Sequence, residues 1–139
     1  MQKGQISIDL LLALVAAILI LFSFNGLANS TYLSYDKINT KQQLELENEN
    51  ITNLITQTQI IDDSNFKINT SFSKINYLDE NNLQLHEYPD ANVQGDKLIL
   101  SINTGKEKIE SIKRFSKSAN TKIIIGSNET RGTLVITNE

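Results

Sequence analysis

The chain has 139 residues, a formal net charge of −3 and no cysteine, and 40% of its residues are hydrophobic. Without cysteine there can be no disulfide and no thiolate metal site, and one histidine, His86, is too few for ordinary imidazole-bound metals or histidine catalysis. The mild negative charge gives no general attraction to nucleic acid. We therefore expect a non-enzymatic protein without metal or cofactor.

Hydrophobic residues concentrate near the amino terminus. Residues 6–28 hold 18 of them in 23 positions, whereas residues 29–139 hold 36 in 111, which excludes a uniform cytosolic globule. As a helix, residues 6–28 extend about 34 Å, enough to cross a hydrocarbon core of about 30 Å. Asp9 needs a compensating partner there, because a carboxylate at mid-bilayer costs about 2.5–3.5 kcal/mol on insertion scales. A secretory signal peptide cleaved after Ala28 and a permanent membrane anchor are two interpretations.

A third interpretation comes from residues 3–9, Lys-Gly-Gln-Ile-Ser-Ile-Asp, which lead directly into the apolar run. This start resembles the class III signal peptide of archaeal type IV pilin-like proteins. In that family a short basic leader ends in glycine, the mature chain begins with glutamine, and serine and glutamate follow at the third and fifth mature positions. Gly4, Gln5 and Ser7 match this pattern, and Asp9 takes the place of the glutamate.

The resemblance implies a route of maturation and assembly. A prepilin peptidase would recognise the leader with Lys3 and cut between Gly4 and Gln5, leaving a one-span membrane precursor whose residues 29–139 lie outside. Pilus assembly machinery in the membrane would then pack the apolar helices of many pilin subunits, of one or several kinds, into an extracellular filament for adhesion or surface attachment. Gln5, Ser7 and Asp9 would act in assembly, with Asp9 paired to the amino group of Gln5 on a neighbouring subunit. The alternative is a membrane-anchored or secreted extracellular binding domain that does not polymerise.

The helix is expected to continue beyond the apolar run, because no glycine or proline interrupts residues 27–88. Apolar residues then recur at spacings that fit one helical stripe: Leu33, Ile38, Leu44, Ile51, Leu54, Ile55 and Ile61. We predict one helix over residues 7–61, whose amphipathic second half packs on a small domain. Gly26 is the expected position of a bend.

The carboxy-terminal part is expected to be rich in strands. Five β-branched or alternating runs predict strands at residues 66–72, 83–88, 97–102, 121–125 and 133–137. Gly126 and Gly132 bracket a polar tip, so the last two strands should form a hairpin. Ile109, Ile112 and Phe115 have helical spacing and predict one short helix within residues 106–118.

These elements predict an α+β fold, in which a long amino-terminal helix, hydrophobic and then amphipathic, packs on a small β-rich head with one short helix. The expected boundaries are a leader at residues 1–4, a transmembrane or filament-core helix at 5–28, an amphipathic stalk at 29–62 and an extracellular head at 63–139. The precursor is expected in the cell membrane and the mature protein in a filament at the cell surface.

Charged and titratable residues give weaker signals. Residues 36–63 have a local charge of −4 and residues 106–122 of +4, so we expect these surfaces to face each other and to lose cohesion with added salt. Nucleic-acid binding by the basic stretch is disfavoured, because its one aromatic, Phe115, is predicted to point inward. His86 beside Glu87 lacks a spaced nucleophile or second ligand, which disfavours catalysis. Calcium binding by Asp62 and Asp63 is disfavoured because EF-hand spacing is missing.

Four Asn-x-Ser/Thr sequons are candidate N-glycosylation sites for a protein whose head lies outside the cell: Asn50, Asn69, Asn128 and Asn29. Asn128 is the favoured candidate, because it lies on the predicted hairpin tip. Asn29 lies close to the membrane and would be crowded in a filament core.

Overall fold

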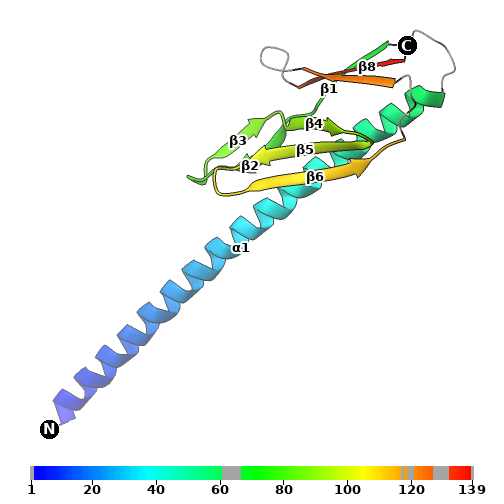
Figure 1. The fold of residues 1–139 in the computed structure, drawn as a ribbon. Helices are drawn as coiled ribbons and strands as arrows, with labels where there is room; N and C mark the ends of the chain where they lie inside the picture. The colour runs from blue at the N-terminus through cyan, green and yellow to red at the C-terminus, as the bar shows by residue number, and fades with distance from the viewer. Residues whose placement is uncertain (1, 61–66, 117, 119–120, 127–131, 139) are drawn as a thin grey trace. The chain divides into compact units, whose positions relative to one another are not determined.

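The protein was analysed as a computed structural model, which describes residues 2–60, 67–116, 118, 121–126 and 132–138 (Figure 1). The chain divides into two compact units, residues 1–35 and residues 36–139. The helix α1, Gln2–Ile60, contributes to both units, and eight strands follow it in the second. The predicted α+β class is confirmed: a long amino-terminal apolar helix is followed by an amphipathic half that packs on a β-rich domain.

Helix α1 contains 59 residues and passes through Gly26 without a break in helical structure. It begins earlier than the predicted Ser7, and Ile61 lies outside the described residues. Hydroxyl groups within it are satisfied locally, since Ser23 donates to the carbonyl of Leu19 at 2.9 Å and Thr31 donates to that of Leu27 at 2.9 Å. Such bonds to the preceding turn let a polar side chain lie in an apolar helix without another partner.

The strands form three antiparallel sheets. In Figure 1 the yellow strands β5 and β6 belong to one sheet, and the red strand β8 belongs to another. The first sheet has the order β1-β8-β7, the second contains β2 and β3, and the third has the order β4-β5-β6. The strand bounds are β1 Lys67–Ser71, β2 Ile75–Leu78, β3 Gln84–Glu87, β4 Asp90–Gln94, β5 Lys97–Asn103, β6 Lys108–Arg114, β7 Thr121–Ile125 and β8 Thr133–Asn138.

All five predicted strands occur, as β1, β3, β5, β7 and β8, and β7 pairs with β8 as the predicted hairpin. The predicted short helix within residues 106–118 is wrong, because residues 108–114 form strand β6, paired with β5. Its burial alternates: Ile109 and Ser111 are buried, whereas Ile112 is 55% exposed on the opposite face. Apolar residues three apart can therefore fit a helix in sequence while lying on opposite sides of a strand.

The core of the second unit joins α1 to all three sheets. Leu44, Ile51 and Ile55 of the helix are at most 4% exposed. They belong to one cluster with buried residues of the strands and loops: Phe72, Ile75, Tyr77, Leu98, Leu100, Ile102, Ile109, Phe115, Leu134 and Ile136. The prediction that Phe115 points inward is confirmed, although Phe115 directly follows strand β6 and does not belong to a helix.

The helical stripe differs from the predicted one in composition. Ile38 is 57% exposed, so it does not belong to the packed face. Polar residues occupy much of that face instead: Thr40, Glu47, Asn48, Thr52 and Thr58 are all buried. An apolar-only pattern missed them because threonine and asparagine are ordinarily surface residues, and they enter a core only with hydrogen-bond partners.

Candidate functional site

The candidate functional site is the apolar part of α1, whose large side chains are exposed from Ile8 to Leu27. Its large apolar side chains between Ile8 and Leu27 are 41–72% exposed. Within the described residues α1 is the one helix that is long and apolar enough to cross a membrane, and none of its most apolar window is buried. Soluble monomers rarely expose an apolar patch larger than a few hundred Å². This segment is therefore suited to contact a bilayer, protein partners, or each in turn.

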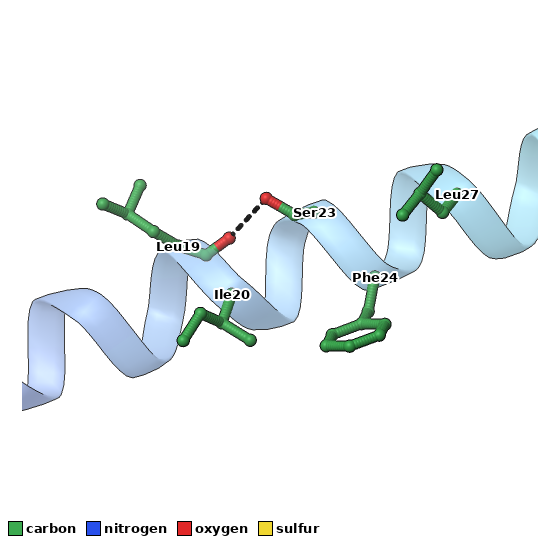
Figure 2. A pocket seen from close by; sticks show the side chains of 5 residues that line it. All are labelled: Leu19, Ile20, Ser23, Phe24 and Leu27. Carbon is green, nitrogen blue, oxygen red and sulfur yellow. Dashed lines mark hydrogen bonds between the residues drawn. The ribbon is translucent and has the colours of Figure 1, made fainter.

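A shallow hollow on this segment has the outline of a packing site for another helix. Figure 2 shows the side chains that line it, Leu19, Ile20, Ser23, Phe24 and Leu27, all on one stretch of α1. Four of them follow the spacing i, i+3, i+4, i+7, which outlines the hole that receives a side chain in knobs-into-holes packing. Ser23 leaves room at this position, and its hydroxyl is already bonded to the carbonyl of Leu19.

A second hollow repeats this outline. It is lined by Ile18, Leu21, Phe22 and Asn25, again at i, i+3, i+4 and i+7. The second set is displaced from the first by two residues, which corresponds to a rotation of about 200° around a helix of 3.6 residues per turn. The two hollows thus lie on nearly opposite sides of α1. Both sides of the apolar segment are therefore exposed.

The predicted processing and assembly residues lie at the start of α1. Lys3, Gly4, Gln5 and Ser7 belong to the helix. Asp9 is exposed within the described residues.

The second half of α1 is held on the head by polar contacts as well as by the core. The amide nitrogen of Asn48 donates to the carbonyl of Leu98 at 3.2 Å and to the carbonyl of Ser111 at 2.9 Å. The Glu47 carboxylate accepts from the backbone N–H of Ser73 at 2.8 Å, and that of Asp36 accepts from the backbone N–H of Leu78 at 3.0 Å. These bonds join α1 to β5, β6, β2 and the loop before β2. They fix the position of the helix along the head, because each needs one particular residue opposite.

The acidic segment 36–63 and the basic segment 106–122 were predicted to face each other, and two ion pairs join them. In one pair the acid lies on the helix as predicted, and in the other the base does. Lys113 of β6 lies 3.6 Å from Glu49 of α1, in the predicted sense. Lys37 of α1 lies 2.6 Å from Glu107, with the basic group on the helix. All four side chains are about half exposed, and such ion pairs contribute about 0–1 kcal/mol each. The apolar core and the buried hydrogen bonds therefore contribute more to cohesion than these charges.

His86 and Glu87 are not brought together as an acid–base pair. They are successive residues of β3, and their side chains project to opposite faces of the sheet. His86 Nδ1 lies 2.6 Å from the Asn76 side-chain oxygen, whereas the Tyr77 hydroxyl donates to Glu87 at 3.2 Å. Across the parts of the chain that the structure describes, no group of three or more histidine, aspartate or glutamate side chains is placed to hold a metal. Asp62 and Asp63 lie outside those parts.

Three of the four sequons can be placed. Asn29 and Asn50 are exposed on α1, and Asn69 is exposed on β1. Asn128 lies outside the described residues.

Comparison with known protein families, curated proteins and solved structures found no match to this chain. The resemblance to pilins therefore rests on residues 3–9 and on the architecture, a long apolar helix followed by a small β-rich domain. Sequence reasoning had located the apolar segment but missed its two hollows. The signal available in the sequence was the pair of small or polar residues, Ser23 and Asn25, at packing positions among larger apolar ones.

Proposed function

We propose that the chain is a structural subunit of an extracellular type IV pilus-like filament, processed between Gly4 and Gln5 and used for adhesion or surface attachment. The observation that carries this proposal is the division of α1. One half is packed on its own head through Leu44, Ile51 and Ile55, while the other half exposes its large apolar side chains from Ile8 to Leu27. A helix so divided is suited to hold a folded head at one end and to pack with other helices at the other.

The two hollows are compatible with a bundle of several helices as the final environment of the apolar segment. Lipid can cover such a surface as well as neighbouring helices can, so the choice of a bundle rests on the resemblance of residues 3–9 to pilins. Holes on nearly opposite sides fit a helix that has neighbours on both sides, as in the centre of a filament. Before assembly the same segment would lie in the membrane, where it is long enough to span.

Asp9 would set the position of each subunit in that bundle. A carboxylate among apolar helices is costly unless paired, and the freed amino group of Gln5 on a neighbouring subunit is a partner of opposite charge. Pairing at one fixed point selects one axial offset between helices, which apolar packing alone does not. Ser7 lies between these two residues in the sequence and completes the proposed assembly motif.

The proposed partners follow from this route. A prepilin peptidase would remove residues 1–4, and pilus assembly machinery in the membrane would transfer the apolar segment from lipid to the filament. The remaining partners are other pilin subunits, identical or different. The head, exposed on the filament, would provide the surface that contacts the environment.

The test is the mass of the mature protein, recovered from material sheared off the cell surface and from membranes. A chain of 135 residues that begins at Gln5, found in sheared filaments, is the expected result. A chain that begins at Asn29 would overturn the proposal in favour of a secreted binding domain. A full-length chain confined to membranes would overturn it in favour of a permanent anchor.

A further inference from the structure

The outer face of the β1-β8-β7 sheet carries an accessible sequon. We infer that Asn69 is an N-glycosylated residue, modified by an oligosaccharide that covers the neighbouring apolar side chains Val135 and Ile124. This inference rests on the proposed function only in placing the head outside the cell. It departs from the prediction that favoured Asn128, and it separates Asn69 from the other sequons that the structure describes.

The conformation of β1 presents the whole Asn69 sequon on one side. In a strand, residues i and i+2 point to the same face, so Asn69 and Ser71 project together. Both are exposed, whereas Thr70 between them is half-buried and lies opposite the buried Leu134. A glycosyl transferase that must contact both the asparagine amide and the hydroxyl of the third residue would find the two groups side by side.

The sequon of Asn50 lacks this arrangement. Asn50 is exposed on α1, but Thr52 is only 6% exposed and points into the head. The Thr52 hydroxyl donates to the carbonyls of Asn48 at 2.8 Å and of Glu49 at 3.1 Å. Two residues along a helix are separated by a rotation of about 200°, so the acceptor amide and the hydroxyl face opposite directions. In the folded protein this sequon cannot be read as a unit.

The sequon of Asn29 has the same unfavourable arrangement as that of Asn50. It too lies within α1, where successive members of the motif turn away from one another. The hydroxyl of Thr31 donates to the carbonyl of Leu27 at 2.9 Å. Of the three sequons in the described residues, only that of Asn69 lies in extended backbone.

The surroundings of Asn69 supply a reason for a glycan at this position. Asn69 pairs with Val135 of β8, which pairs in turn with Ile124 of β7, so the three side chains form one row across the outer face. Ile124 is 47% exposed and Val135 is half-buried. Cross-strand neighbours lie about 4.5–5.5 Å apart at Cβ, so the first sugars on Asn69 would extend over both residues. Ile124 lies on β7, at the edge of the sheet, where an exposed apolar residue is a site of unwanted association that a sugar layer would shield.

The modification is a group transfer from a lipid-phosphate-linked oligosaccharide, supplied at the outer surface of the membrane. The amide nitrogen of Asn69 forms a bond to the anomeric carbon of the first sugar. The bond from that carbon to the phosphate oxygen breaks, the lipid phosphate leaves with the electron pair, and the nitrogen loses one proton.

The test uses the protein isolated from the cells that make it and a tryptic digest. Cleavage after lysine and arginine places the four sequons on separate peptides: residues 42–67 for Asn50, 68–74 for Asn69, 123–131 for Asn128, and the amino-terminal peptide ending at Lys37 for Asn29. We expect peptide 68–74 to carry the oligosaccharide mass and peptide 42–67 to lack it. Peptide 68–74 found without sugar, or peptide 42–67 modified to an equal extent, would overturn the inference.

Variants confirm the assignment without disturbing the core. Asn69→Gln and Ser71→Ala, both at exposed positions, should each remove the sugar mass from peptide 68–74, whereas Ser71→Thr should keep it. Asn50→Gln is the matched control and should leave the mass of the protein otherwise unchanged. Retention of the mass in Ser71→Ala would count against modification through the sequon.

The same digest separates this inference from the proposed function. A mature chain that begins at Gln5 with an unmodified peptide 68–74 overturns the glycan and leaves the filament proposal intact. A modified peptide 68–74 on a chain that begins at Asn29 does the reverse.

Discussion

The side-chain nitrogen of Asn48, buried on α1, lies 2.9 Å from the backbone carbonyl oxygen and 3.1 Å from the hydroxyl oxygen of Ser111 on β6, so that, with the Leu98 carbonyl, three acceptors share its two N–H hydrogens. A single amide group thus joins the helix to the β5–β6 hairpin. In the sequence, Asn48 is only a polar residue that interrupts the apolar stripe of the helix. This contact leads to the first prediction.

Asn48→Ala is expected to destabilise the head by about 1–3 kcal/mol, because it removes buried hydrogen bonds and leaves a cavity. Asn48→Asp should cost more, since a carboxylate would face the carbonyl oxygens of Leu98 and Ser111. The measurement is urea unfolding of the full chain in detergent, followed through its four tyrosines. Asn53→Ala, at an exposed position of the same helix, is the control, and an equal effect of Asn48→Ala and Asn53→Ala would contradict the prediction.

Gly132→Ala is expected to be more damaging than Gly95→Ala. Both glycines have positive φ, of 89° and 62°, where an L-residue is strained by about 1–2 kcal/mol. A Cβ on Gly95 meets open space, but a Cβ on Gly132 would lie 2.7 Å from the ring of Tyr88. Thermal unfolding of the two variants should give the lower midpoint for Gly132→Ala. Equal midpoints would mean that the ring moves aside without cost.

Ser23→Leu is expected to fill the hollow between Ile20, Phe24 and Leu27 while making the helix more apolar. Membrane insertion and cleavage after Gly4 should be unaffected, but incorporation into filaments should fall, because overpacking a helix contact costs about 1–3 kcal/mol. The fraction of the protein in sheared filaments is the measurement. Ser23→Ala keeps the hollow and should assemble normally. Normal assembly of Ser23→Leu would show that the hollow receives no neighbouring side chain.

Asp9→Ala is expected to be processed at Gln5 but left in the membrane, since the subunit would lose its proposed ionic partner. Asp9→Glu keeps the charge and should restore assembly. Amino-terminal mass and the ratio of filament to membrane protein separate the two steps. Wild-type incorporation of Asp9→Ala would remove Asp9 from the assembly motif.

The sequence predicts much of this fold because several elements obey one simple rule each. The alternation in residues 97–102 matches β5, and the glycines at 126 and 132 bracket the β7–β8 hairpin. β2 and β4 were not predicted. The β4 sequence Asp-Ala-Asn-Val-Gln has only Ala91 and Val93 packed against the core, and its polar residues have low strand propensity.

The other incorrect predictions share one physical cause: at these residues, contacts with distant parts of the chain determine the structure. Ile112 suggested a helix because its spacing from Ile109 is three residues, yet pairing with Ile99 of β5 places it on the outer face of a sheet. Asn48 is a polar residue in sequence and a core residue in the fold, because β5 and β6 supply acceptors for its amide. The apolar segment could be located from composition. The position of each hollow on it depends on the sizes of the side chains that line it, and composition does not give these.

The polar lining of the packed face of α1 also bears on export. In the proposed route of export, the stalk would cross the membrane before the head has folded over it, and a long apolar stretch would be held in the bilayer. Thr40, Asn48, Thr52 and Thr58 keep residues 36–60 too polar to be retained, although these side chains later become part of a buried core. These polar residues of one helix face thus keep the stalk out of the bilayer. In the folded head Thr40 and Asn48 donate hydrogen bonds to strands, whereas the hydroxyls of Thr52 and Thr58 donate to carbonyls of α1 itself.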